Sequence, residues 1–81
     1  MDAREQERFH TIFQQIGGEL RGHQKRMEAS TTAMRTKVVR WIENAQSRGY
    51  PVQDACGLIG ISRNTFYLWK KELERIENNG N

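Results

Sequence analysis

The sequence predicts an all-α protein, in which a tri-helical domain follows an additional amino-terminal amphipathic helix. Apolar residues recur at intervals of three and four along most of the 81 residues, which places them on one face of an α-helix. The pattern is interrupted at Gly49-Tyr50-Pro51 and again at Gly60, where turns are expected. A chain of this length forms one small domain.

Residues 1–32 are predicted to form an amphipathic helical segment. A seam at alternating spacings of four and three is typical of a helix that pairs with another helix. Its positions are Phe9, Phe13, Ile16, Leu20, His23, Met27, Ser30 and Met34, and they are apolar except at His23 and Ser30.

The seam has two interpretations, packing in cis on the rest of the chain or pairing with a second protomer. We favour a homodimer, because the strongly apolar stretch 9–16 needs cover that a small core does not provide. Gly17, Gly18 and Gly22 each cost about 1 kcal/mol relative to Ala inside a helix, so a break after Ile16 is also considered. The expected dimerisation residues are Phe9, Ile12, Phe13, Ile16 and Leu20.

A second helix is predicted over residues 33–48. Met34, Val38, Ile42 and Ala45 recur at helical spacing, with Trp41 beside them. Thr31 or Thr32 is the expected cap of this helix. Pro51 is expected to begin the next helix or to stand just before it, because its missing N–H costs nothing there.

Residues 52–73 are predicted to form two short helices that cross steeply over a turn. Gly60 follows the last apolar residue of the first helix, where a left-handed conformation closes it, and Ser62 is placed to cap the second helix. The second helix should run to about Glu77, which gives a domain over residues 33–77 and a disordered tail over 78–81. The expected apolar contacts of the two helices are Ala55, Ile59, Ile61, Phe66, Trp69 and Leu73.

This layout is that of a helix-turn-helix that reads DNA. The stretch Gly60-Ile61-Ser62-Arg63-Asn64-Thr65-Phe66-Tyr67-Leu68-Trp69 resembles the recognition-helix segment of helix-turn-helix domains in bacterial transposases, site-specific recombinases and small phage or plasmid regulators. The chain departs from that pattern at Cys56, where Ala is more usual, and at Gly57. Cys is small enough to fit, and we interpret Cys56 as a buried packing residue.

The charge distribution agrees with a DNA-binding surface. Residues 35–71 carry seven basic and two acidic side chains, a balance of +5, whereas residues 1–34 are neutral overall and residues 72–81 carry −2. The basic excess therefore coincides with the predicted helix-turn-helix, as contact with phosphates requires. The alternative is an ordinary solvated basic face.

Specific DNA contacts follow from the position of the second helix. Its amino-terminal residues face base edges in the major groove. Arg63 can donate two hydrogen bonds to guanine, and Asn64 can bond adenine in two places. Tyr67 and Leu68 also point outward, and Tyr67 could contact a phosphate, contact a thymine methyl group or simply cover the helix surface. Ser62 and Thr65 are candidate phosphate contacts. Lys70 and Lys71 suit the flanking backbone, as does Arg40 or Arg48 if the preceding helix crosses the phosphates.

Catalytic and metal-binding functions find no support in the sequence. No phosphate-binding Gly-rich loop, paired-carboxylate site or Ser-His-Asp set is present. His10 and His23 belong to the helical segment, and Asp54 suits the first turn of its helix. We expect no enzyme activity, cofactor, metal or membrane span, and a location in the bacterial cytosol or nucleoid.

The sequence therefore predicts a sequence-specific binder of double-stranded DNA, acting as a small transcriptional regulator of a phage, plasmid or mobile element. The mobile-element part follows from the resemblance. One alternative is the DNA-recognition subunit of a transposition, recombination or packaging complex. Another is a helical protein-protein adaptor, which would lack salt-dependent affinity for DNA.

Overall fold

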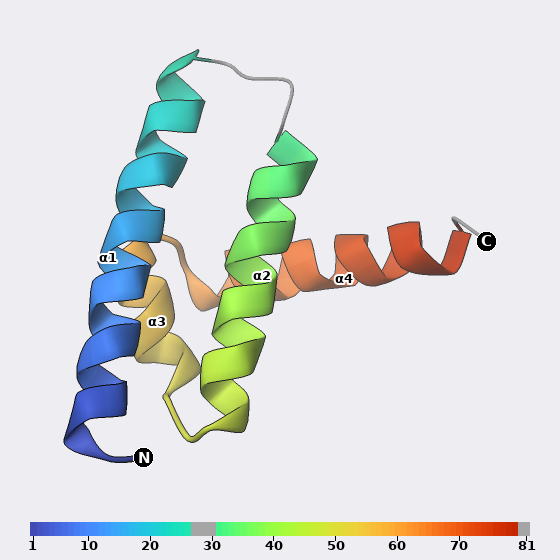
Figure 1. Cartoon of the computed structure of the whole chain (residues 1–81). Coiled ribbons are helices and arrows are strands. Elements are labelled where there is room, and N and C mark those ends of the chain that lie inside the picture. The colour runs from blue at the N-terminus through green and yellow to red at the C-terminus, as the bar shows by residue number, and fades with distance from the viewer. Residues whose placement is uncertain (27–30, 80–81) are drawn as a thin grey trace.

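The computed structural model describes residues 1–26 and 31–79, which form four α-helices and no strand. The helices are α1 (Ala3–Arg26), α2 (Thr31–Ser47), α3 (Val52–Ile59) and α4 (Arg63–Asn79). α1 and α2 run antiparallel, α3 contacts both of them, and α4 crosses α2 steeply and projects beyond it (Figure 1). The predicted all-α class with an additional amino-terminal helix is confirmed.

The helix ends lie close to their predicted positions. α1 begins after Asp2, whose Oδ1 accepts a hydrogen bond from the Glu5 backbone N–H at 2.8 Å. Pro51 stands just before α3, as predicted. α2 already begins at Thr31, so neither Thr31 nor Thr32 precedes the helix as the predicted cap. α4 includes Asn78 and Asn79, which corrects the predicted start of the tail, and residues 80–81 lie outside the described part.

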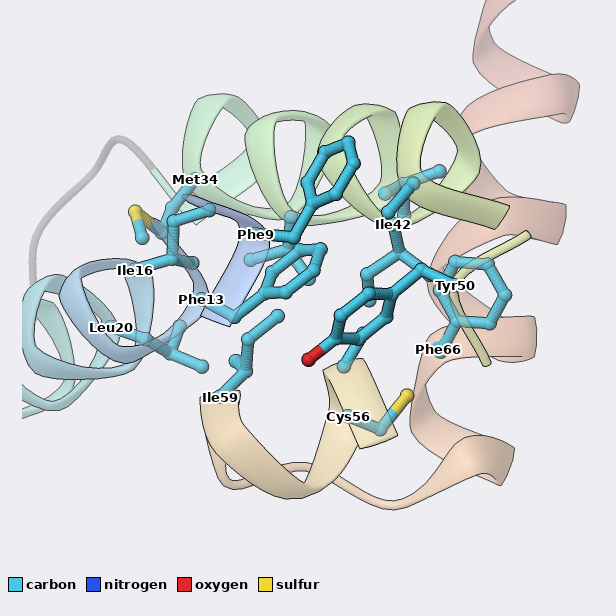
Figure 2. Packing of buried hydrophobic residues seen from close by; sticks show 14 residues of the cluster. Phe9, Phe13, Ile16, Leu20, Met34, Ile42, Tyr50, Cys56, Ile59 and Phe66 are labelled. Carbon is cyan, nitrogen blue, oxygen red and sulfur yellow. The ribbon is translucent and has the colours of Figure 1, made fainter. Parts of the chain in front are cut away.

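All four helices contribute to one apolar core. Phe13 of α1, Val38 of α2 and Phe66 of α4 are fully buried, and Ile59 of α3 is 1% exposed. Ile61, Trp69 and Leu73 pack against this core while remaining partly exposed. The buried side chains are Phe9, Phe13, Ile16, Leu20, Met34, Val38, Val39, Ile42, Ala45, Tyr50, Ala55, Cys56, Ile59 and Phe66 (Figure 2).

Three aromatic rings join α1 to the connection between α2 and α3. The Phe9 and Phe13 rings stack with centroids 6.0 Å apart. The Tyr50 ring lies 5.8 Å from the ring of Phe9 and 5.5 Å from that of Phe13. Geometries of this kind stabilise aromatic pairs beyond their buried area. Tyr50, which the sequence indicated only as the end of a helix, is thus a core residue.

The apolar seam of α1 is covered within the chain, which corrects the expected dimerisation surface. The first four seam residues, Phe9, Phe13, Ile16 and Leu20, are all buried, and Ile12 packs partly buried beside them. The spacing of the seam was predicted correctly, but its partner is not a second protomer. α3 and α2 of the same chain cover the seam. The side chains of His23, Met27 and Ser30 lie outside the described part.

A glycine allows α1 to lie this close to α3. A Cβ atom on Gly17 would stand 2.8 Å from the Ile59 carbonyl oxygen and 3.0 Å from that of Leu58. Real Cβ atoms do not approach backbone oxygens so closely. α1 also continues unbroken past Gly17, Gly18 and Gly22, so the break considered after Ile16 does not occur.

Candidate nucleic-acid interface

The turn between α3 and α4 has the geometry that the sequence predicted. Gly60 adopts a left-handed conformation with φ of 95°, which a side chain would disfavour. The backbone N–H groups of Gly60 and Ile61 both donate to the carbonyl oxygen of Cys56, at 2.8 and 3.0 Å. These bonds close α3 and turn the chain directly into α4.

The first turn of α4 is fixed by two hydroxyl groups. The Thr65 backbone N–H donates to Ser62 Oγ at 3.1 Å, which confirms Ser62 as the helix cap. The hydroxyl oxygens of Ser62 and Thr65 also lie 2.9 Å apart in a hydrogen bond. Both predicted phosphate contacts therefore serve first to shape the start of α4, and Ser62 remains exposed there.

One face of α4 points into solvent along its amino-terminal half. Phe66 is fully buried beneath this face and anchors it to the core. Tyr67 and Leu68 are 51% and 61% exposed, although both are large side chains with apolar surface. The exposed residues of this face, hereafter the recognition face, are Arg63, Asn64, Tyr67, Leu68 and Lys71.

Two other predicted DNA contacts, Lys70 of α4 and Arg40 of α2, lie where these two helices meet instead of on the recognition face. Lys70 is partly buried, and its Nζ stands 3.6 Å from a carboxylate oxygen of Glu43. Arg40 pairs with Glu43 at 3.8 Å and with Glu77 near the end of α4. The structure therefore groups Lys70 and Arg40 in ion pairs between α2 and α4, apart from the recognition face.

Arg48 lies at the connection between α2 and α3. Its guanidinium group donates to the carboxylate of Glu5 in the first turn of α1. This hydrogen bond lowers the pKa of Glu5 and raises the pKa of Arg48, and the opposite charges of the two groups shift both values further in the same directions. The exposed cation is thus balanced by an acid from outside the predicted helix-turn-helix.

The acidic residues of α4 lie in its second half, and two of them hold the helix against α2. Glu72 pairs with Arg35 at 2.9 Å, and the Arg35 guanidinium lies 5.2 Å from the centre of the Trp69 ring. Glu77 pairs with Arg40. Because residues 63–71 contain no acid, the recognition face is cationic while the far half of α4 is tied to α2.

Two further exposed arginines, Arg75 and Arg21, are not among the DNA contacts that the sequence predicted. Arg75 lies one helical turn beyond Lys71, a spacing that could have placed it on the same side of α4. Arg21 belongs to α1, yet its Nη1 lies 3.7 Å from where a Cβ on Gly60 would stand. No sequence signal connects residues 21 and 60, because only the packing of α1 on α3 brings them together.

Metal-ligand clusters, membrane-spanning helices and the environment of Cys56 can be described for the same part of the chain. Residues 1–26 and 31–79 contain no group of three or more His, Cys, Asp or Glu side chains that could hold a metal ion. Within the same ranges, no helix is long and apolar enough to cross a membrane. Cys56 is 2% exposed, in agreement with its predicted packing role, and burial raises the pKa of its thiol.

Comparison with known proteins agrees with this geometry. Residues 30–78, which include α2, α3 and all but the last residue of α4, match the homeodomain-like domain, a helix-turn-helix module found in transposases and related DNA-binding proteins. No curated protein and no solved structure matches the chain. The matched residues make up more than half of the chain, and α1 is an additional helix that packs on them. The chain therefore belongs to the homeodomain-like family of helix-turn-helix DNA-binding domains.

Proposed function

We propose that this protein recognises specific sequences in double-stranded DNA by inserting the amino-terminal half of α4 into the major groove. The observation that carries the proposal is the recognition face, which is exposed, cationic and free of acids over residues 63–71. A major groove about 12 Å wide admits an α-helix, and helix-turn-helix proteins place the start of their second helix there.

Arg63 and Asn64 are the proposed readers of base identity. The guanidinium of Arg63 can donate two parallel hydrogen bonds to O6 and N7 of guanine. The Asn64 amide can donate to N7 of adenine and accept from its N6 amino group. The exposed side chains of Tyr67 and Leu68 are suited to apolar contact with thymine methyl groups.

Cations around the recognition face are proposed to hold the DNA backbone. Lys71 lies on the face itself. In homeodomains the connection between the first two helices contacts the backbone, and Arg48 occupies that connection here. Arg40 and Lys70 would act as phosphate contacts only by exchanging their carboxylate partners for phosphates. These contacts would position the protein without reading sequence.

The proposal also includes a biological role for the DNA binding. We propose a small transcriptional regulator of a phage, plasmid or mobile element, acting in the bacterial cytosol or nucleoid. The occurrence of the matched module in transposases favours one alternative, a DNA-recognition subunit of a transposition or recombination complex whose catalysis resides in another protein. A promoter operator as the bound site supports the regulator, whereas an element end supports the alternative.

A homodimer stays a prediction, although not through the seam of α1. Ile76, on the projecting end of α4, is 53% exposed and offers an apolar surface that this chain does not cover. Two recognition helices on one side of the duplex would contact half-sites about 10 base pairs apart. Sedimentation of the full chain with and without its DNA site measures the stoichiometry directly.

Selection of bound fragments from random double-stranded DNA tests the proposed function. We expect enrichment of one short motif, protection of that motif in a footprint, and affinity that falls steeply with salt. The double variant Arg63→Ala/Asn64→Ala is the matched control, because it leaves the core unchanged and should lose the preference at the base positions that these two side chains read. Failure of the wild-type protein to bind DNA in a salt-dependent manner would favour the protein-protein adaptor.

A further inference from the structure

Arg21 is positioned beside the helix-turn-helix by tight packing of α1. Gly17 rests against the backbone of Leu58 and Ile59 at the end of α3, where a Cβ would meet carbonyl oxygens at 3.0 and 2.8 Å. Arg21 follows one helical turn later on the same side of α1. Its guanidinium therefore reaches Gly60, in the turn that leads into the recognition face.

Arg21 also differs in its partners from three arginines of α2 and of the connection that follows it. Arg35, Arg40 and Arg48 each pair with a carboxylate. Among the described residues, by contrast, no carboxylate pairs with Arg21, and its side chain is exposed. A guanidinium without an acidic partner can donate bidentate hydrogen bonds to a phosphate without first breaking an ion pair.

We propose that Arg21 contacts a phosphate of the bound DNA, on the strand that borders the amino-terminal end of α4. This inference rests on the proposed function, because it assumes that the recognition face enters the major groove. It extends the DNA-binding surface beyond the matched residues 30–78, and it gives α1 two roles. α1 completes the core through its buried seam and adds a backbone contact beside the turn.

The salt dependence of DNA binding tests this contact. Each phosphate neutralised by a cation contributes about 0.9 to the slope of log K against log salt concentration on B-DNA. We expect Arg21→Ala to reduce the slope by about that amount and to weaken specific and non-specific binding alike, because phosphate contacts carry no sequence information. Arg21→Lys keeps the charge and should restore the slope.

Arg8→Ala is the matched control for net charge. Arg8 is also an exposed arginine of α1, but it lies 13 residues earlier, about 20 Å along the helix axis. This distance exceeds the Debye length of about 8 Å at physiological salt. We expect Arg8→Ala to reduce the slope less than Arg21→Ala does, and circular dichroism should give all variants the wild-type melting curve.

The outcomes separate this inference from the proposed function. If the wild-type protein binds its selected site and Arg21→Ala and Arg8→Ala give equal slopes, the Arg21 contact is wrong while the proposed function stands. If Arg21→Lys behaves like Arg21→Ala, the inference also fails, because charge alone should restore most of a phosphate contact. If the wild-type protein shows no salt-dependent binding to DNA, both proposals fall together.

Discussion

Gly17 of α1 lies against the carbonyl oxygen of Ile59, the last residue of α3, at a distance that leaves no room for a side chain. This contact joins the amino-terminal helix to the residue immediately before the turn of the helix-turn-helix. Its position explains how a helix outside the matched domain can influence both the stability and the orientation of the DNA-binding unit.

Substitutions of neighbouring glycines should have opposite effects on stability. Gly17→Ala forces α1 away from α3, and overpacking of this kind typically costs about 1–3 kcal/mol. Gly18→Ala is the control, because a Cβ there meets no atom within 4 Å and Ala is favoured over Gly in a helix by about 1 kcal/mol. In thermal unfolding, Gly18→Ala should have the highest melting temperature, the wild type an intermediate one and Gly17→Ala the lowest. Equal melting temperatures for the two variants would contradict the close approach of α1 to α3 at Gly17.

Loss of α1 should unfold the domain instead of releasing a stable tri-helical unit. Phe9, Phe13, Ile16 and Leu20 fill the same core as the other three helices. Phe13→Ala alone should cost about 3–5 kcal/mol, a large part of the about 5–15 kcal/mol that stabilises a small domain. We expect a protein lacking residues 1–26 to show no cooperative melting transition. A well-folded truncated protein that binds DNA normally would disprove the structural role of α1.

Alkaline pH should weaken the fold through two buried groups. Burial raises the pKa of the Cys56 thiol above its ordinary value of 9.0, and burial followed by the charge of Asp54 raises the pKa of Tyr50 above 10.0. As the pH rises, the unfolded chain therefore loses these protons at a lower pH than the folded protein does. The contribution of the two groups to the free energy of unfolding is complete below pH 9 and is lost as the pH rises through their pKa values in the folded protein.

Urea unfolding between pH 7 and 11 measures this effect, with Cys56→Ala as the comparison. The difference in unfolding free energy between wild type and Cys56→Ala should shrink above pH 9, because only the wild type has a thiol to ionise. A difference that stays constant or grows across this range would show that the thiol is not shielded.

Glu5 should weaken DNA binding by engaging Arg48. The carboxylate accepts hydrogen bonds from the guanidinium, and Arg48 occupies the connection that contacts the backbone in homeodomains. Glu5→Gln should free the cation, raise the affinity for DNA and steepen its salt dependence. Glu7→Gln removes the same charge from an exposed position of α1. If both variants raise the affinity equally, net charge and not the Arg48 pair is responsible.

The sequence predicted the local features of the fold well, because short-range rules govern them. Apolar spacing located the helices, and the conformation of Gly60 and the cap at Ser62 follow from their neighbours in the chain. The same rules could not decide what covers an apolar seam, because spacing identifies a buried face and not its partner. Gly17, which looks like a weak point of a helix in sequence, is a packing contact in three dimensions.

The predicted interface was only partly recoverable from the sequence for a related reason. The residues of the recognition face follow from helical periodicity once Phe66 is known to be buried. Ion pairs such as Arg35 with Glu72 join residues 37 positions apart, so no local pattern indicates them. Consequently the pairs of Arg40 with Glu77 and of Lys70 with Glu43 were not predicted, and neither was the position of Arg21.

The contact between Arg63 and a guanine tests the central claim most directly. Replacing guanines of the selected site one at a time by 7-deazaguanine removes the N7 acceptor that a bidentate arginine would use. At one position we expect wild-type affinity to fall by about 5- to 150-fold, equivalent to about 1–3 kcal/mol, whereas Arg63→Ala should bind both DNAs equally. If no 7-deazaguanine substitution distinguishes the wild type from Arg63→Ala, α4 does not read the major groove through this residue.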